Sequence, residues 1–348
     1  MMSDWEPSAS IGTLRARAQL LARVRAFFAE RDVLEVETPM LGQGGSTDVH
    51  LASLSAEART PAGRQRLWLQ TSPEFHMKRL LAAGSGPIFQ LAKSFRDGEV
   101  GGRHNIEFTM LEWYRPGFGL SALLDETAAL IRTILPDCVL PEAQGVPKRH
   151  GNLKRYGNLK RYAYRELFHT HLDIDPFNVS LERLRKLAAE RGFMHAGALD
   201  HEPRDTCLDL LMSMVIEPTL GQSGEGLGEL VAVVDYPASQ AALARRHVDD
   251  YGDEVASRFE LYLNGIELAN GYDELTDPVE QRARFDEDNA ERRRLGFDEV
   301  DVDTRLVAAL EHGLPEGSGV ALGFDRLIQL ALGKPRLSDV ISFDTTRC

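Results

Sequence analysis

The sequence predicts an α+β fold in which an antiparallel β-sheet is flanked by helices. Two candidate hairpins predict the sheet: Ile88–Phe95 followed by 107–114 across a glycine-rich turn, and 259–275, where Asn264-Gly265 lies between β-rich flanks. A helix is predicted at 13–32, because apolar residues recur there at steps of three and four. With 348 residues, of which 43% are apolar, the chain is long enough for two average domains or one large α+β domain.

The remaining segments alternate between short strands and amphipathic helices. Strands are predicted at 33–38, 67–70 and 231–235, and helices at 121–135, 180–191 and 283–295. The segment TSPEFHMKRLL opens a further helix, for which we predict Ser72 as the N-cap and Pro73 as the first helical residue.

Composition limits the classes of function. The net charge of −13 and the pI near 5.3 argue against a surface that binds polyanions generally. Cys138, Cys207 and Cys348 are widely spaced and contain no CxxC pair, which predicts neither a disulfide framework nor a zinc site. Because no apolar run approaches ~18 residues and the N-terminus has no apolar signal region, we expect a cytoplasmic protein with no membrane association.

One segment, at about 136–162, is rich in proline, glycine and basic residues, and it repeats GNLKRY at 151–156 and 157–162. We interpret it as a solvated, partly disordered insertion; a docking patch for an acidic partner is the alternative. Its basic residues are Lys148, Arg149, Lys154, Arg155, Lys160 and Arg161.

The first hairpin, FRDGEVGGRHNIEFTMLEWY, has the residue types that bind a nucleotide triphosphate. Arg96, Arg103 and His104 would lie on phosphates, because a planar guanidinium matches phosphate oxygens in pairs. Phe108 would lie under a base, since aromatic faces stack on bases. The alternative is a solvated, charged hairpin.

The second hairpin, FELYLNGIELANGYDEL, predicts a magnesium site. If Asn264-Gly265 forms a two-residue turn, Tyr262 lies opposite Glu267, and Glu260 projects from the same face, diagonally across. Two carboxylates that converge without a basic partner are costly unless a cation lies between them, and hard oxygen ligands suit Mg²⁺. The alternative is two exposed glutamates on an edge hairpin. Glu274 is a third carboxylate beyond the turn.

The third motif, GSGVALGFDRLIQLALG, predicts a strand of small residues that leads into a helix near Gly323. Arg326 would lie in the first helical turn, close to a bound ligand. On its own, this motif is a weak signal, and the alternative is a packing joint between a strand and a helix.

Together these segments resemble the three signature motifs of class II aminoacyl-tRNA synthetases, most closely the lysyl branch, from about Leu14 to the C-terminus. Motif 1 is the N-terminal helix with VLEVETPML, motif 2 the first hairpin and motif 3 GVALGFDRL. The resemblance implies a class II synthetase catalytic core, and Pro39 at the usual dimer contact implies a homodimer.

The resemblance also implies roles for individual residues. Arg96 and Arg326 would be catalytic, with Arg96 at the α-phosphate and the substrate carboxylate. The implied ATP ligands are Arg96, Arg103, His104, Asn105, Phe108, Glu267, Leu268, Gly323 and Arg326. The implied amino-acid ligands are Ser72, Pro73, Glu74, Glu112, Tyr114, Asn270, Glu274 and Ala321, and Glu260 with Glu267 would bind Mg²⁺. Several carboxylates suit a substrate with two ammonium groups, and catalysis would proceed by positioning and charge neutralisation, without a protein nucleophile.

The chain leaves no room before motif 1 for the β-barrel with which lysyl-tRNA synthetases grip the anticodon. It is therefore similar to the synthetase paralogues that use ATP to ligate (R)-β-lysine to a lysine of elongation factor P, without tRNA. WEPSAS, FTMLEWYRP, YPASQAAL and GIELANGYDELTD carry this closer resemblance. Ala321 stands where the tRNA enzymes have glycine, and its methyl group would favour a β-amino acid.

Two positions depart from the family pattern: Gly98 replaces the usual motif 2 glutamate, with Glu99 one residue later, and Ile106 replaces a proline. Two other functions stay open, and Gly98 favours only the second of them. One is a truncated ligase that charges tRNA with lysine. The other is a non-catalytic regulator that binds an amino acid or ATP.

Overall fold

The structure, a computed structural model, describes residues 5–61, 63–135, 159–191, 199, 201–222 and 228–348. The chain divides into two compact units. Unit 1 comprises Met1–Gly119, Ala129–Leu153 and Leu275–Cys348, and unit 2 comprises Leu120–Ala128 and Lys154–Glu274, so that the boundary falls within α3 (Leu120–Ile134). The sequence-based prediction of one catalytic domain stays a prediction.

Four strands of unit 1 lie side by side. Their order is β1 (Leu34–Glu35), β5 (Ile88–Phe95), β6 (Glu107–Pro116) and β12 (Gly317–Gly323). β1 pairs with β5 in parallel, and the other two pairings are antiparallel. The predicted first hairpin is thus confirmed. The strand predicted at 33–38 is only two residues long.

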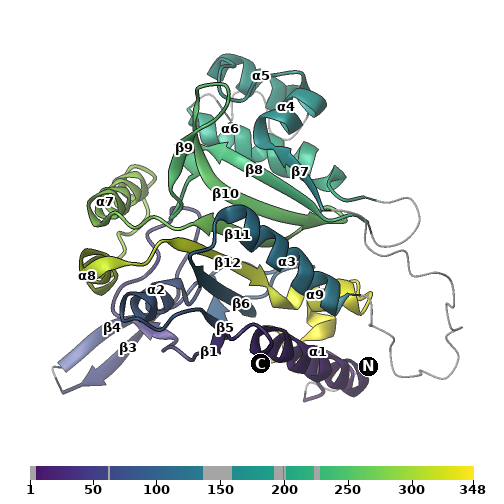
Figure 1. Cartoon of the computed structure of the whole chain (residues 1–348), viewed down its shortest axis with the longest axis vertical. Coiled ribbons are helices and arrows are strands. Elements are labelled where there is room, and N and C mark those ends of the chain that lie inside the picture. Colours follow the sequence, from purple (N-terminus) through teal and green to yellow (C-terminus); the bar gives the residue numbers. More distant parts are fainter. Residues whose placement is uncertain (1–4, 62, 136–158, 192–198, 200, 223–227) are drawn as a thin grey trace, which may run out of the picture. The chain divides into compact units, whose positions relative to one another are not determined.

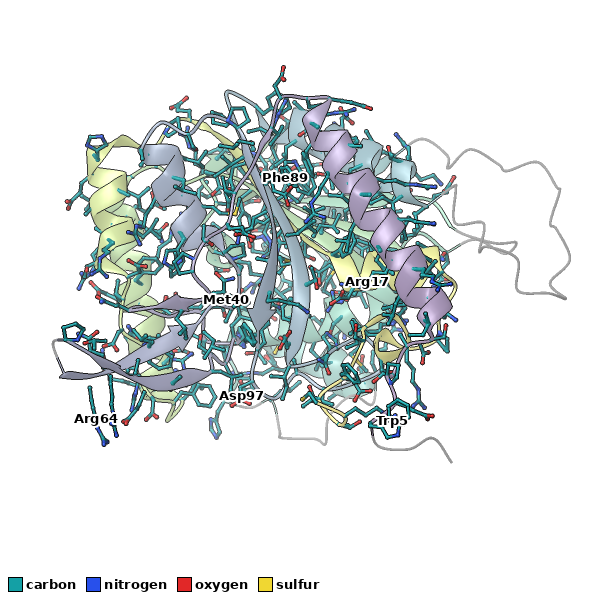
Figure 2. The ribbon with its side chains drawn as sticks, turned by 90° about the horizontal axis from the view of Figure 1, so that it is seen from below. Trp5, Arg17, Met40, Arg64, Phe89 and Asp97 are labelled. Atoms are coloured by element: carbon teal, nitrogen blue, oxygen red, sulfur yellow. The ribbon has the colours of Figure 1, made fainter. Side chains whose placement is uncertain are left out.

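One face of these strands packs on α1 (Ile11–Ala29), which begins after Ser10, whose hydroxyl accepts a hydrogen bond from the amide of Thr13 at 3.1 Å. Phe28 of α1 stacks on Phe89 of β5, with ring centroids 4.3 Å apart, and meets the edge of Trp113. Figure 2 labels Phe89, a residue of β5, beside α1. Because side chains alternate along a strand, the even-numbered residues of β6, which include Glu112, project from the opposite face.

The other elements of unit 1 are helices and a small sheet. The helices are α2 (Glu74–Ala82), α7 (Pro278–Arg294), α8 (Thr304–Gly313) and α9 (Phe324–Ala331), and a 3₁₀ turn covers Leu337–Val340. The small sheet has the strand order β2 (Leu41–Gly42), β4 (Gly63–Leu69) and β3 (Ser55–Thr60). Figure 2 labels Arg64 at the free end of the β3–β4 hairpin.

Two predicted helix starts are wrong. α2 begins at Glu74, with Pro73 as its N-cap, because Pro73 has a non-helical ψ of 2°; Ser72 instead accepts a hydrogen bond from the Glu74 amide at 3.3 Å. α7 begins at Pro278 rather than at 283. The Asp277 side chain caps it by accepting from the amides of the second and third helical residues.

Unit 2 contains a second group of paired strands. Their order is β11 (Ile266–Asp273), β10 (Glu254–Leu263), β8 (Val231–Pro237) and β7 (Lys160–Ala163), and β9 (Arg246–Val248) also pairs with β10. The helices are α4 (Tyr164–Leu172), α5 (Leu181–Glu190) and α6 (Arg204–Leu211), followed by a π-helical turn (Met212–Ile216) and 3₁₀ turns (Glu217–Thr219 and Ala238–Gln240). Figure 1 shows α4, α5 and α6 gathered beside β7 and β8. Tyr164 and Phe168 of α4, stacked at 4.6 Å, contribute to the core formed there.

The predicted Asn264-Gly265 hairpin is confirmed: both residues have positive φ, 53° and 67°, and Tyr262 lies opposite Glu267. Beyond that pair the register shifts by one residue at Leu268. Glu260 consequently lies opposite Asn270, so the bulge adds Asn270 to the face that carries both glutamates.

Most of the basic insertion, residues 136–158, lies outside the described residues. The interpretation of the segment as a solvated, partly disordered insertion stays a prediction. Its last residues belong to a strand, because Lys160–Ala163 form β7 and pair in parallel with β8. Lys160 pairs with Glu229, and Arg161 pairs with Asp125 at 2.7 Å, so both charges have local partners.

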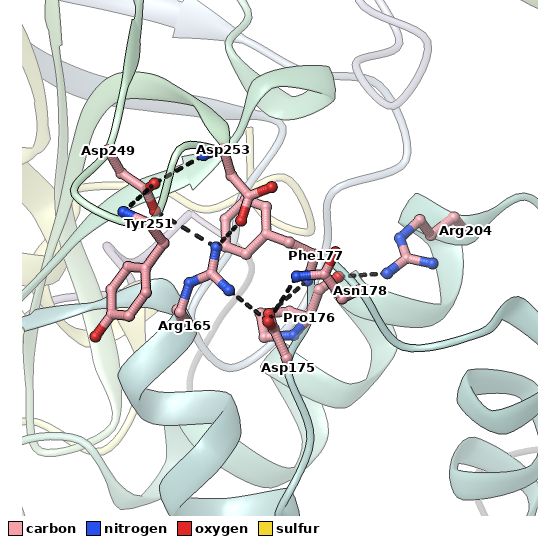
Figure 3. A network of polar contacts seen from close by, with 9 residues as sticks. All are labelled: Arg165, Asp175, Pro176, Phe177, Asn178, Arg204, Asp249, Tyr251 and Asp253. Atoms are coloured by element: carbon pink, nitrogen blue, oxygen red, sulfur yellow. Dashed lines mark hydrogen bonds and ion pairs between the residues drawn. The ribbon is translucent and has the colours of Figure 1, made fainter.

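A polar network fixes the loop between β9 and β10 to α4 (Figure 3). The buried side chain of Arg165 pairs with Asp175 at 2.5 Å, with Asp249 at 3.5 Å and with Asp253. Its guanidinium also lies 4.6 Å from the ring centroid of Tyr251.

Among the described residues, no helix is both long and apolar enough to cross a membrane.

Candidate active site

The conformation of the turn in the first hairpin accounts for glycine at position 98, where the family pattern has glutamate. Gly98 has φ of +75°, a left-handed conformation that favours glycine, although a Cβ there would meet no atom within 4 Å. Glu99 then reaches Arg96, with a nitrogen–oxygen distance of 3.6 Å. The turn therefore keeps a carboxylate beside Arg96, one position later than the family pattern. Arg96 also lies over the ring of Phe108, 5.2 Å from its centroid.

His104 and Arg326 meet although they are far apart in the sequence. The Arg326 guanidinium donates to Nε2 of His104 at 2.7 Å. Burial lowers the pKa of His104, and Arg326 lowers it further, as do Arg96 and Arg103. A neutral imidazole among three arginines is well suited to bind an anion such as a polyphosphate.

Asn105 has a structural role that the sequence did not reveal. Its amide nitrogen donates to the Glu107 carbonyl at 2.7 Å, and its oxygen accepts from the amide and the hydroxyl of Thr345, at 3.0 and 2.8 Å. Asn105 therefore links the hairpin to the last described turn of the chain. The predicted contact of Asn105 with adenine stays a prediction.

A second polar group lies on the opposite face of β6 from α1. Glu112 and Tyr114 are buried, the Tyr114 hydroxyl donates to Glu112, and Ala321 of β12 lies directly opposite Glu112. On α2, Glu74 pairs with Lys78 at 2.6 Å, and the Lys78 side chain is only 1% exposed. We did not predict a role for Lys78. The i, i+4 spacing from Glu74 was the available signal.

Asp325 holds the strand-to-helix joint that carries Arg326. Its carboxylate pairs with Arg17 of α1 at 2.5 Å and accepts from the Thr109 amide of β6 at 2.7 Å. The Arg17 guanidinium also donates to the Thr109 hydroxyl at 3.0 Å. The third motif is thus a packing joint in which Asp325 is buried. It also carries Gly323 and Arg326, which are half-buried.

In unit 2, Glu260 has more partners than predicted. It is 8% exposed and accepts from the hydroxyls of Tyr236, at 2.7 Å, and Tyr262, and it pairs with Arg258. The expectation that no basic residue lies near the carboxylates is wrong. Arg258, two residues before Glu260 on the same strand, projects from the same face.

The donor set nevertheless fits a magnesium ion that arrives with a nucleotide. Mg²⁺ in such sites takes one or two carboxylates, and phosphates and water supply the other ligands. Glu260 and Glu267 lie on one face of β10 and β11. Within the described residues, no group of three or more His, Cys, Asp or Glu side chains could hold a metal ion by itself. Binding of Mg²⁺ stays a prediction.

Three further predicted ligands lie on or next to β11. Leu268 is buried at the bulge, Asn270 is partly exposed, and Glu274 is 3% exposed, with its carbonyl accepting from Arg245 at 2.9 Å. The Asn270 side-chain oxygen accepts from Arg258 at 3.1 Å.

The chain belongs to the class II tRNA synthetase family, since the family model "tRNA synthetases class II (D, K and N)" matches residues 4–347. This confirms the predicted class II synthetase fold and the resemblance of the three motifs. Three curated relatives have nearly full-length similarity, and each is named elongation factor P (R)-β-lysine ligase. The protein of Pseudoalteromonas translucida is 48% identical over 99% of this chain and 98% of its own. The protein of Haemophilus influenzae is 46% identical over 98% of both chains. The protein of Proteus mirabilis is 46% identical over 99% of both chains.

Proposed function

We propose that this protein is an ATP-dependent ligase that activates (R)-β-lysine as an adenylate and transfers it to a lysine side chain of elongation factor P. The main observation in support is the similarity, over almost the whole chain, to relatives named elongation factor P (R)-β-lysine ligase. Membership of the class II synthetase family supports the adenylate chemistry.

ATP would bind along the first hairpin. Arg96 would lie at the α-phosphate, Arg103 and His104 at the outer phosphates, and Arg326 over the adenine face opposite Phe108. The contacts among Arg96, Phe108, His104 and Arg326 support this assignment. The remaining ATP ligands would be Asn105, Glu267, Leu268 and Gly323.

The amino acid would be held by carboxylates. Glu74, Glu112 and Glu274 would bind its ammonium groups, with Tyr114 donating to Glu112, and Asn270 would bind its carboxylate. Ser72 and Pro73 would line the same subsite, and the Ala321 methyl group would limit the space beside Glu112.

Mg²⁺ would be held by Glu260 and Glu267, where it would neutralise phosphate charge. The other residues of the site contribute by holding the reactants in position and by neutralising charge. A β-lysine carboxylate oxygen attacks the α-phosphorus in line, and the bond to pyrophosphate breaks. The acceptor amine then attacks the acyl carbonyl, loses a proton and displaces AMP. Arg96 would stabilise the charge that develops at the α-phosphate.

The first test is ATP–pyrophosphate exchange with (R)-β-lysine and with α-lysine, without tRNA, followed by transfer of labelled β-lysine to elongation factor P. We expect exchange that prefers the β isomer.

Ala321→Gly should shift that preference toward α-lysine, because it removes the crowding methyl group; an unchanged preference contradicts the role of Ala321. Arg326→Gln should reduce exchange, whereas Arg293→Gln, on the exposed surface of α7, serves as its control.

Two other results would overturn the proposal. Exchange that prefers α-lysine, with transfer to tRNA, would favour a tRNA ligase. No exchange with either isomer would favour a regulator that binds ATP or an amino acid.

A further inference from the structure

Arg258 links several polar groups of unit 2. Its Nε donates to the Asn270 side-chain oxygen at 3.1 Å and one terminal nitrogen donates to the Gln240 carbonyl at 2.9 Å, while the other pairs with Glu260. Its guanidinium also lies 4.5 Å from the ring centroid of Tyr236. All three guanidinium nitrogens therefore have a partner, and the orientation of the group is fixed.

The strand register accounts for these contacts. Glu260 lies opposite Asn270, and Arg258 lies opposite Tyr272, so that the side chains share one face of the hairpin. Without the bulge at Leu268, Asn270 would project from the other face.

The contact between Arg258 and Asn270 determines which end of the amide is available. Arginine can only donate hydrogen bonds, so the Asn270 oxygen must be the atom turned toward Arg258. The amide nitrogen, with its two N–H donors, is then on the other side. A carboxylate accepts hydrogen bonds and is repelled by an amide oxygen, so only this orientation suits a carboxylate ligand.

We infer that Arg258 is a positioning residue for the reaction: it holds the Asn270 amide with its nitrogen toward the carboxylate of the amino-acid substrate. The inference rests on the proposed function, in which Asn270 binds that carboxylate.

Arg258→Lys tests this role. Lysine keeps the positive charge beside Glu260, but its single nitrogen cannot reproduce the three directed contacts of the guanidinium. We expect the KM for (R)-β-lysine in pyrophosphate exchange to rise about tenfold, the scale of one hydrogen bond to a charged group. An unchanged KM for β-lysine overturns the inference.

A substrate analogue separates positioning from general damage. 1,4-Diaminopentane is β-lysine without its carboxylate, so its inhibition constant should be the same for the wild-type protein and Arg258→Lys. An equal loss of affinity for the diamine would show that Arg258 only supports the fold. The double variant Arg258→Lys/Asn270→Ala should bind β-lysine as weakly as Asn270→Ala alone; additive losses would contradict the coupling.

Asn270→Asp provides a test if Arg258→Lys does not fold. It keeps the size and the contact with Arg258 but replaces the amide donor with an oxygen, so it should bind β-lysine more weakly than Asn270→Ala. Equal or tighter binding would overturn the inference. Failure of the proposed function is distinguishable, because the wild-type protein itself would then show no exchange with β-lysine.

Discussion

At the scale of single residues, His104 shows how the hairpin is prepared for an anion. Burial is the largest cause of its lowered pKa, and Arg326 is the second. The folded protein therefore binds fewer protons at His104 than the unfolded chain does around the ordinary pKa of 6.5. The contribution of His104 to the stability of the fold is consequently complete above pH 6.5 and decreases as the pH falls below it.

We expect Arg326→Gln to raise the pKa of His104 toward its ordinary value, because the variant removes the nearest positive charge and leaves the burial unchanged. NMR titration of the His104 ring protons measures this pKa. Arg293→Gln, which removes a charge from an exposed ion pair with Glu299, is the control. If His104 titrates identically in the wild-type protein and Arg326→Gln, the contact with Arg326 does not exist in solution.

At the scale of secondary-structure elements, Arg165 connects three segments of unit 2. Its aspartate partners come from the residues before α5 and from the β9–β10 loop (Figure 3). The Arg165 side chain is only 7% exposed, and loss of the guanidinium would leave three carboxylates close together.

Arg165→Met should therefore destabilise the protein by about 2–4 kcal/mol, since it breaks a largely buried ion network but retains most of the side-chain volume. Urea unfolding followed by far-UV circular dichroism measures the change. Arg282→Met removes the exposed pair with Asp286 on α7 and should cost at most about 0.5 kcal/mol. Equal effects of the two variants would contradict the importance of the network.

At the scale of the whole molecule, we propose that the protein is a homodimer, as the motif 1 resemblance implies. Apolar side chains near motif 1 are exposed: Ile11 is 58%, Leu34 56%, Met40 49% and Leu41 43% exposed. Exposed apolar side chains of this size often mark an interface between proteins. The cytoplasmic location predicted from the sequence stays a prediction.

Leu34→Asp combined with Met40→Asp should shift the protein from dimer to monomer in sedimentation equilibrium, because it places charges in the proposed interface. Val279→Asp is the control, since Val279 on α7 is 77% exposed. A wild-type monomer would contradict the dimer. Equal dissociation of the control would contradict the placement of the interface at Leu34 and Met40.

The sequence predicted the local features of the site well. The glycine-rich turn and the Asn264-Gly265 turn depend on neighbouring residues. Both hairpins form, and the second has the predicted pairing next to its turn. The joint near Gly323 also forms where the pattern placed it.

The missed features are contacts between distant residues and local irregularities. Asn105 meets Thr345 across 240 positions, and Arg17 meets Asp325 across more than 300, which no periodicity encodes. The bulge at Leu268 adds Asn270 to the glutamate face, and the turn signal alone predicted a regular register. The extension of α7 was missed although Asp277-Pro278 is a recognisable start signal.

The division into two units has a consequence for spectroscopy. All three tryptophans, Trp5, Trp68 and Trp113, belong to unit 1, where Trp113 is fully buried and Trp5 is 78% exposed. Tryptophan fluorescence, excited selectively, therefore reports on unit 1 and does not report directly on the loss of structure in unit 2. Coincidence of the fluorescence transition with the transition in circular dichroism would show that the two units unfold as one cooperative system. Separate transitions would give each unit its own free energy of unfolding.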